Sequence, residues 1–166
     1  MDFNIIDERN YTEVAGIYEE GIRTGMATFE TKVPDWQTWS KAHLEIGRTV
    51  VIENGRVLAW GALAPVSHRY AYRGVAEVSV YVAESARGRG LGKAVLLELI
   101  RASEENNLWT LQAGIMRQNV GSIEMHKKCG FRVIGFREKV AQLNSIWTDS
   151  ILMERRSKLA GTDYQK

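Results

Sequence analysis

The chain has 166 residues, 45% of them hydrophobic, which suits one domain whose core needs neither disulfides nor a structural metal. Its 22 basic and 20 acidic residues give a net charge of +2, a balance that argues against a nucleic-acid or membrane surface and favours a small-molecule substrate. The single cysteine, the lack of an apolar run of the ~20 residues that a membrane helix needs, and an N-terminus unlike a signal peptide predict a cytoplasmic protein.

The pattern of apolar residues predicts eleven elements in the mixed order β-α-α-β-β-β-α-β-α-β-β. In chain order we expect a strand at 3–7, helices opening at Asn10 and Asp35, strands at 48–53, 56–64 and 75–82, a helix from the turn at 87–92 to about 106, a strand at 111–115, a helix at 119–129, and strands at 131–140 and 147–154. Asn10 with Glu13 is typical of a capping box, and Asn54-Gly55 strongly favours a hairpin.

This order favours the α/β class, of α+β type, with a twisted, mixed and largely antiparallel sheet of about seven strands flanked by about four helices. We expect residues 1–158 to form a single domain. The polar tail at 159–166 is expected to fray.

A glycine-rich turn follows the strand 75–82, in the run Arg87-Gly-Arg-Gly-Leu-Gly-Lys93. Glycines let the backbone approach a ligand closely, and the helix that follows points its free N–H groups into the turn, which suits phosphate. The Rossmann pattern fails because Lys93 replaces its third glycine, and Walker A fails because Arg87 and Ala94 replace its glycine and its hydroxyl residue. The alternative is a tight turn beside two solvated arginines.

A second motif is the predicted helix Asn119-Val-Gly-Ser-Ile-Glu-Met-His-Lys-Lys-Cys-Gly-Phe131. At 100° per residue, Asn119, Ser122 and His126 lie within an arc of roughly 60°, so that one face can meet a ligand. A plain helix cap is the alternative role of Asn119, and the two roles are compatible. Cys129, a conceivable nucleophile, fits better as a small buried hydrophobe.

The strand 75–82 carries a carboxylate that needs explaining. Period-two geometry places Glu77, Ser79 and Tyr81 on one face of the strand. Beside a covered sheet the Glu77 carboxylate would be desolvated, which suits a general base that takes a proton from an ammonium group near neutral pH. The alternative is a glutamate exposed to water or paired with Arg73.

These motifs resemble the GCN5-related N-acetyltransferase (GNAT) superfamily over roughly residues 3–156. Arg87, Gly90 and Gly92 fill the fixed places of its Gln/Arg-x-x-Gly-x-Gly/Ala loop, and the segment 119–131 resembles its Asn-x-x-Ala/Ser-x-x-x-Tyr/His motif closed by Gly-Phe. The runs 72–82 and 27–31 resemble the branch that acts on phosphinothricin, methionine sulfoximine and arsinothricin. One departure from that branch is Leu143-Asn-Ser-Ile-Trp147, where its members often have Lys-Phe-Gly-Arg-Trp.

The resemblance implies a GNAT N-acetyltransferase domain, an acyltransferase that moves acetyl from acetyl-CoA directly, in a ternary complex, to the amine of a small amino acid or analogue. It also implies a homodimer and a link to antibiotic or herbicide resistance. Glu77 would be the general base and His126 the acid for the thiolate. The implied cofactor-binding residues are Val80, Tyr81, Val82, Arg87, Gly88, Arg89, Gly90, Leu91, Gly92, Lys93, Asn119 and Ser122. The implied substrate-binding residues are Phe29, Arg69, Tyr72, Arg73 and Tyr81.

We expect no metal, because His43, His68 and His126 lack both the mutual spacing and the acidic partners of a metal site. Two other functions stay open. A protein N-terminal or lysine acetyltransferase would need an open groove for a peptide, whereas Phe29 and Tyr72 favour a closed pocket. A sensor that binds acetyl-CoA without turnover would have no use for Glu77.

Overall fold

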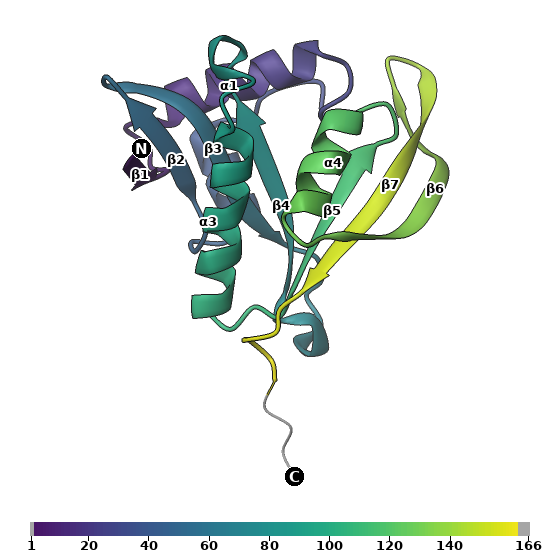
Figure 1. Cartoon of the computed structure of the whole chain (residues 1–166). Coiled ribbons are helices and arrows are strands. Elements are labelled where there is room, and N and C mark those ends of the chain that lie inside the picture. Colours follow the sequence, from purple (N-terminus) through teal and green to yellow (C-terminus); the bar gives the residue numbers. More distant parts are fainter. Residues whose placement is uncertain (1, 163–166) are drawn as a thin grey trace.

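A seven-stranded sheet, with strands in the order β1-β2-β3-β4-β5-β7-β6, organises the computed structural model, which describes residues 2–162 (Figure 1). The strands are β1 (Asp2–Ile5), β2 (Thr49–Glu53), β3 (Arg56–Pro65), β4 (Val75–Val82), β5 (Thr110–Met116), β6 (Arg132–Leu143) and β7 (Ile146–Arg156). The α-helices are α1 (Tyr11–Arg23), α2 (Trp36–Ala42), α3 (Leu91–Glu105) and α4 (Val120–Lys128), and short 3₁₀ turns span Tyr70–Tyr72 and Glu84–Ala86. The predicted order and fold class are therefore confirmed.

Helices cover both faces of the sheet, with α3 and α4 on one face and α1 on the other (Figure 1). Two neighbouring residues of β3 show why. A Cβ at Gly61 would lie 2.5 Å from Val95 of α3, so glycine lets this helix approach the sheet closely. The side chain of the preceding residue, Trp60, points to the opposite face. There its ring stacks on that of Tyr81, with 4.6 Å between centroids, and lies 5.6 Å from the ring of Tyr18 in α1.

Several local predictions are confirmed. The Asp35 side chain accepts a hydrogen bond from the Thr38 N–H at 2.8 Å and caps α2. Asn54 and Gly55 have φ of 51° and 75°, the left-handed conformation that a tight hairpin between β2 and β3 requires. Gly130, which follows the Cys129 cap of α4, has φ of 87°, in agreement with a helix expected to end at 129. Each of these features depends on a few consecutive residues.

The predicted capping box at the start of α1 is wrong, although Asn10 does occupy the cap position. The Asn10 side chain turns back, accepting from the Asp7 N–H at 3.0 Å and donating to the Ile5 carbonyl at 2.9 Å. The Glu13 carboxylate instead accepts from the Val57 N–H of β3 at 2.9 Å. Local partners of Asn10 and a tertiary partner of Glu13 therefore replace the capping box.

The fraying predicted for the tail 159–166 is wrong at its beginning. Ala160 is buried, and its carbonyl accepts from the Arg156 guanidinium at 2.9 Å. The Gly161 carbonyl accepts from the same guanidinium at 2.7 Å. Residues 163–166 lie outside the described residues.

The sheet parts in its middle. β4 and β5 are the one parallel pair within residues 2–162, and they pair only from Val75 to Glu77 and from Thr110 to Gln112. Beyond these residues β4 continues along β3 and β5 along β7, so the two halves of the sheet diverge. This divergence positions the site described next.

Candidate active site

A cavity of about 610 Å³ opens where β4 and β5 diverge. Its wall comes from α1, the loop 24–35 between α1 and α2, α2, β4, β5 and α4. The wall holds the carboxylates, cation, histidines and large aromatic side chains Glu30, Glu77, Lys32, His43, His126, Tyr18, Phe29, Trp39 and Tyr81. Acid–base groups and apolar surface thus line the same cavity, the usual arrangement of a small-molecule site.

Glu77 stands where the shared ladder of β4 and β5 ends. It pairs with Gln112 in register, and its Oε2 accepts a hydrogen bond from Gln112 Nε2 at 3.3 Å. The Glu77 side chain lines the cavity but is exposed to solvent. The predicted desolvation of its carboxylate is therefore wrong for the protein alone. The physical reason is that the strands separate directly after Glu77. The alternative pairing with Arg73 is not formed either, since that guanidinium donates to the Tyr70 carbonyl.

His126 is only 4% exposed and faces the cavity from α4. Its Nδ1 lies 2.8 Å from the Ser122 carbonyl oxygen, which can only accept, so Nδ1 carries the hydrogen and Nε2 is the acceptor of the neutral ring. Burial lowers the pKa of His126, while the bond to Ser122 partly opposes this shift. The resting form near neutral pH is therefore the neutral imidazole, which must gain a proton at Nε2 before it acts as an acid.

The open edge of β4 supplies backbone donors. The Ala83 N–H donates to the Leu58 carbonyl of β3 at 2.8 Å. Because the N–H direction alternates along a strand, the N–H groups of Val80 and Val82 point away from β3, toward the divergence, whereas that of Tyr81 points toward β3. Of the three β4 residues implied to bind the cofactor, Tyr81 therefore cannot do so through its backbone N–H.

The Tyr81 side chain does reach the cavity. It stacks on Trp60 with an interplanar angle of 19°, and its ring centroid lies 4.9 Å from that of Tyr18. Burial raises the pKa of the Tyr81 hydroxyl well above its ordinary value. The hydroxyl is therefore protonated at neutral pH and serves as a neutral hydrogen-bonding group in the wall.

The glycine-rich turn has the conformation expected of a phosphate site. Gly88 and Gly90 have φ of 76° and 78°, and Gly90 occupies the cap position of α3. The first helical bond runs from the Ala94 N–H to the Gly90 carbonyl, so the N–H groups of Leu91, Gly92 and Lys93 precede it. A Cβ at Gly88 or Gly90 would meet no protein atom within 4 Å, which shows that backbone conformation, not crowding, requires glycine there.

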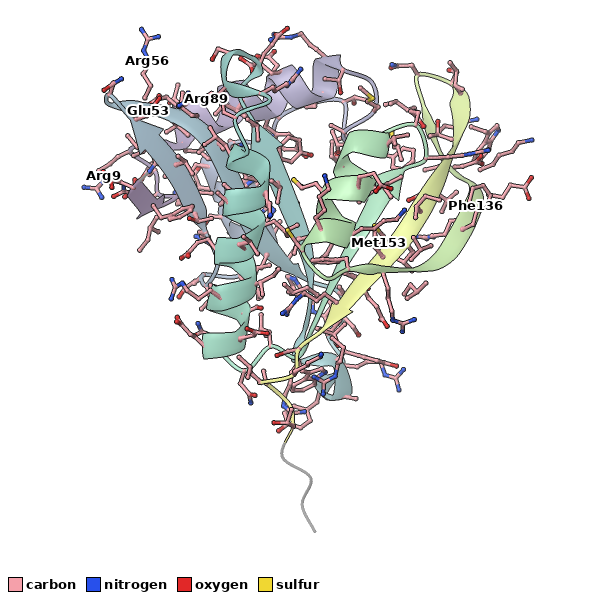
Figure 2. All side chains as sticks on the ribbon, viewed as in Figure 1. Arg9, Glu53, Arg56, Arg89, Phe136 and Met153 are labelled. Carbon is pink, nitrogen blue, oxygen red and sulfur yellow. The ribbon has the colours of Figure 1, made fainter. Side chains whose placement is uncertain are left out.

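The two arginines of this turn differ. The Arg89 guanidinium lies 2.9 Å from the Glu53 carboxylate at the end of β2, and Figure 2 shows both side chains at the same end of the molecule. Arg87 is exposed and makes no ion pair within residues 2–162. Arg87 is therefore more available than Arg89 to bind a phosphate group. The side chain of Leu91, which was also expected to bind the cofactor, is buried in the core.

Asn119, Ser122 and His126 all line the cavity, as the helical spacing predicted. The Asn119 Oδ1 accepts from the Ser122 N–H at 3.3 Å, which confirms the helix cap. Its Nδ2 donates to the Met26 carbonyl of the loop 24–35 at 3.2 Å.

The predicted substrate residues separate into two groups. Phe29 and Tyr81 line the cavity. Arg69, Tyr72 and Arg73 do not, because they precede β4 at the end where it is still paired with β5. The Arg73 guanidinium lies over the rings of Tyr70 and Trp109, at 4.1 and 5.1 Å, and Arg69 lies over the Tyr72 ring at 5.5 Å. The two arginines that were expected to bind the substrate, Arg69 and Arg73, therefore lie outside this cavity.

Sequence reasoning missed several wall residues, among them Lys32 and His43. Lys32 contributes the cationic side chain of the wall, and its position three residues after Phe29 was the available signal. His43 is half-buried, stacks on Trp39 at 4.1 Å, and has its Nδ1 2.7 Å from the Trp39 carbonyl. Burial lowers the pKa of His43, so it too is neutral at neutral pH.

Cys129 is buried at the end of α4, and burial raises the pKa of its thiol, which agrees with a structural role. Within residues 2–162 no group of three or more histidine, cysteine or acidic side chains is arranged to hold a metal ion. In the same part of the chain, no helix combines the length and the apolar character needed to cross a membrane.

Comparison of the sequence with known proteins identifies a family and several relatives. A sequence model described as the acetyltransferase (GNAT) family matches residues 10–131. The chain is 31% identical over 158 residues to a phosphinothricin N-acetyltransferase of Alcaligenes faecalis, covering 91% of this chain and 80% of the relative. It is 29% identical over 147 residues to an L-methionine sulfoximine/L-methionine sulfone acetyltransferase of Pseudomonas aeruginosa, covering 85% and 86%.

The fold is also that of a solved relative. The crystal structure of a GNAT superfamily phosphinothricin acetyltransferase from Sinorhizobium meliloti, in complex with AcCoA, matches with a TM-score of 0.88 at 24% identity. The match covers 99% of this chain and 92% of that one.

Proposed function

This chain belongs to the GNAT family of acetyltransferases, and we propose that it transfers the acetyl group of acetyl-CoA to the amine of a small amino acid or amino-acid analogue. The observation that carries the proposal is the cavity at the divergence of β4 and β5, which brings Glu77 and His126 together beside the open edge of β4. The relatives named for phosphinothricin and methionine sulfone support this class of substrate.

Acetyl-CoA fits the backbone of this site. Its pyrophosphate would accept hydrogen bonds from the free N–H groups at the start of α3, where the helix dipole favours negative charge. Its pantetheine arm would lie along β4 as an added strand, bonded to the N–H groups of Val80 and Val82. The same N–H groups are candidate donors to the oxyanion that forms when the thioester carbonyl is attacked.

In a direct transfer of the acetyl group to the amine, Glu77 and His126 account for the two protons that the substrate nitrogen loses. Glu77, directly or through a water, takes one proton from the substrate ammonium, and the free amine attacks the thioester carbonyl. The nitrogen of the tetrahedral intermediate must lose a second proton, which the neutral Nε2 of His126 can accept and pass to the departing thiolate. The C–S bond breaks as the amide forms. His126 thus acts as an acid only after it has collected this proton.

The cavity also offers an anchor for an anionic group of the substrate. Lys32 is the one lysine or arginine in its wall, and the Lys32 side chain makes no ion pair or hydrogen bond that involves residues 2–162. Lys32 is exposed, and an unpaired ammonium in a cavity wall attracts a carboxylate or phosphinate. With Glu77 at the amine and Lys32 at the anion, the wall has complementary charges for a zwitterionic amino acid.

Lys32→Gln should raise the Michaelis constant for the amine substrate about tenfold and leave that for acetyl-CoA nearly unchanged, because a hydrogen bond to a charged group is lost. Steady-state kinetics with L-methionine sulfone measures both constants. Lys41→Gln, an exposed lysine on α2 outside the cavity wall, is the matched control. If Arg73→Ala raised the Michaelis constant for the amine and Lys32→Gln did not, Arg73 would be the residue that binds the substrate anion.

The proposed function is tested by a screen of amines with acetyl-CoA, read by release of free thiol. The panel holds free amino acids, methionine sulfone, methionine sulfoximine, phosphinothricin, arsinothricin, and peptides with free N-termini or lysines. Turnover of the small amines alone supports the proposal. Turnover of peptides alone would replace it with a protein acetyltransferase, and acetyl-CoA binding without any turnover would indicate a sensor.

We also propose a homodimer, as the family resemblance implies. The outer part of the β6–β7 hairpin exposes Phe136, Ile146 and Trp147 by 53%, 68% and 57%, and Figure 2 shows Phe136 at the edge of the molecule. Covering these side chains would remove apolar surface from water. We expect the mass of two chains by light scattering, and the mass of one chain in Trp147→Asp. A wild-type chain that stays monomeric at high concentration would contradict the dimer.

A further inference from the structure

One hydrogen bond links the loop 24–35 to the start of α4 beside the cavity. The Asn119 Nδ2 at the start of α4 donates to the Met26 carbonyl at 3.2 Å, across 93 positions of sequence. The loop 24–35 forms much of the wall on the α1 side, including Phe29 and Lys32. Among the residues that the structure describes, this is the only hydrogen bond from that loop to the half of the protein formed by β5–β7 and α4.

The same amide begins a chain of hydrogen bonds that ends at His126. The Asn119 Oδ1 accepts from the Ser122 N–H at 3.3 Å, and the Ser122 carbonyl accepts from His126 Nδ1 at 2.8 Å. The bond to Ser122 fixes both the tautomer and the direction of the His126 ring. The Asn119 side chain therefore contacts the loop 24–35 and also supports the turn of α4 that orients the His126 ring.

We propose that Asn119 is a positioning residue that clamps the loop 24–35 over the amine substrate and, through the first turn of α4, aligns His126, so that loop closure and alignment are one event. The inference rests on the proposed function, and the family resemblance also implies that Asn119 binds the cofactor. An asparagine amide has two N–H donors, and the Met26 carbonyl occupies one of them. The second donor stays available to the cofactor, so cofactor and amine should each tighten the binding of the other.

Asn119→Asp separates the clamp from the helix cap. Aspartate caps a helix as well as asparagine does and keeps the acceptor for the Ser122 N–H, but it has no donor for the Met26 carbonyl. Without any ligand, we expect the rate of amide hydrogen exchange in the loop 24–35 to rise about three- to tenfold. This is the change that the loss of one hydrogen bond produces. The melting temperature should stay near that of the wild type.

Binding of the amine is the second measurement. By calorimetry with L-methionine sulfone and no cofactor, we expect Asn119→Asp to bind about three- to tenfold more weakly than the wild type. In the wild type, added coenzyme A should tighten this binding, and in the variant it should do so less. Asn119→Ser, which also caps a helix but has no amide donor, should reproduce both effects.

The matched control is Asn10→Asp, the same substitution at the cap position of α1, where the side chain donates to the Ile5 carbonyl away from the cavity. It should change neither exchange in 24–35 nor amine binding. Unchanged exchange and unchanged cofactor-free amine binding in Asn119→Asp would overturn the clamp, and Asn119 would then serve only the cofactor arm. If no amine is turned over by the wild type, the proposed function fails, and the exchange measurement still decides the clamp.

Discussion

Replacing Glu77 with glutamine should lower the turnover number about 10²- to 10⁴-fold at neutral pH, the contribution of a positioned general base. Glutamine has nearly the same shape and keeps an oxygen that can accept from Gln112 Nε2, so the end of the β4–β5 ladder should stay intact. It cannot take up a proton. The Michaelis constant for acetyl-CoA should change little, because the proposed cofactor contacts are with the glycine-rich turn and the open edge of β4.

The pH dependence distinguishes a lost base from a damaged site. In Glu77→Gln, only substrate molecules whose amine is already free can react, so the rate should keep rising with pH toward the pKa of the substrate amine. Glu30→Gln, which changes the other carboxylate of the wall, is the informative comparison. A smaller loss in Glu30→Gln supports Glu77 as the base. Wild-type turnover and an unchanged pH–rate profile in Glu77→Gln would reject it.

The features that sequence predicted correctly are those that a few neighbouring residues determine. The Asn54-Gly55 hairpin, the Asp35 cap and the common face of Asn119, Ser122 and His126 follow from local chain geometry, whatever the rest of the protein does. The glycine-rich turn could therefore be interpreted as a phosphate site from its residues and its place between a strand and a helix.

The features that sequence did not predict depend on where β4 and β5 part. Pairing stops at Glu77 and Gln112, and this single point of divergence exposes Glu77 and leaves Arg73 outside the cavity. No short pattern encodes it, because it results from the register of strands that are distant in sequence. Lys32 was missed for the same reason, since its loop forms a wall only when α1 and α2 pack on the sheet.

Gly90→Val should weaken acetyl-CoA binding about a hundredfold or more, because the β-branched side chain would crowd the N–H groups proposed to bind the pyrophosphate, and more than one charged hydrogen bond would be lost. Calorimetric titration with coenzyme A measures this directly, without any amine. The Michaelis constant for the amine should move less, since Lys32 and Phe29 lie in a different part of the site.

Backbone strain is the competing explanation, because Gly90 has φ of 78° and valine disfavours positive φ. Gly55→Val provides the matched control, since Gly55 has φ of 75° and a Cβ there would likewise meet nothing within 4 Å. The two variants should lose similar stability in urea denaturation, whereas only Gly90→Val should lose cofactor affinity. Equal affinity in both would show that the diphosphate binds elsewhere, and the assignment of this turn as the cofactor site would fall with it.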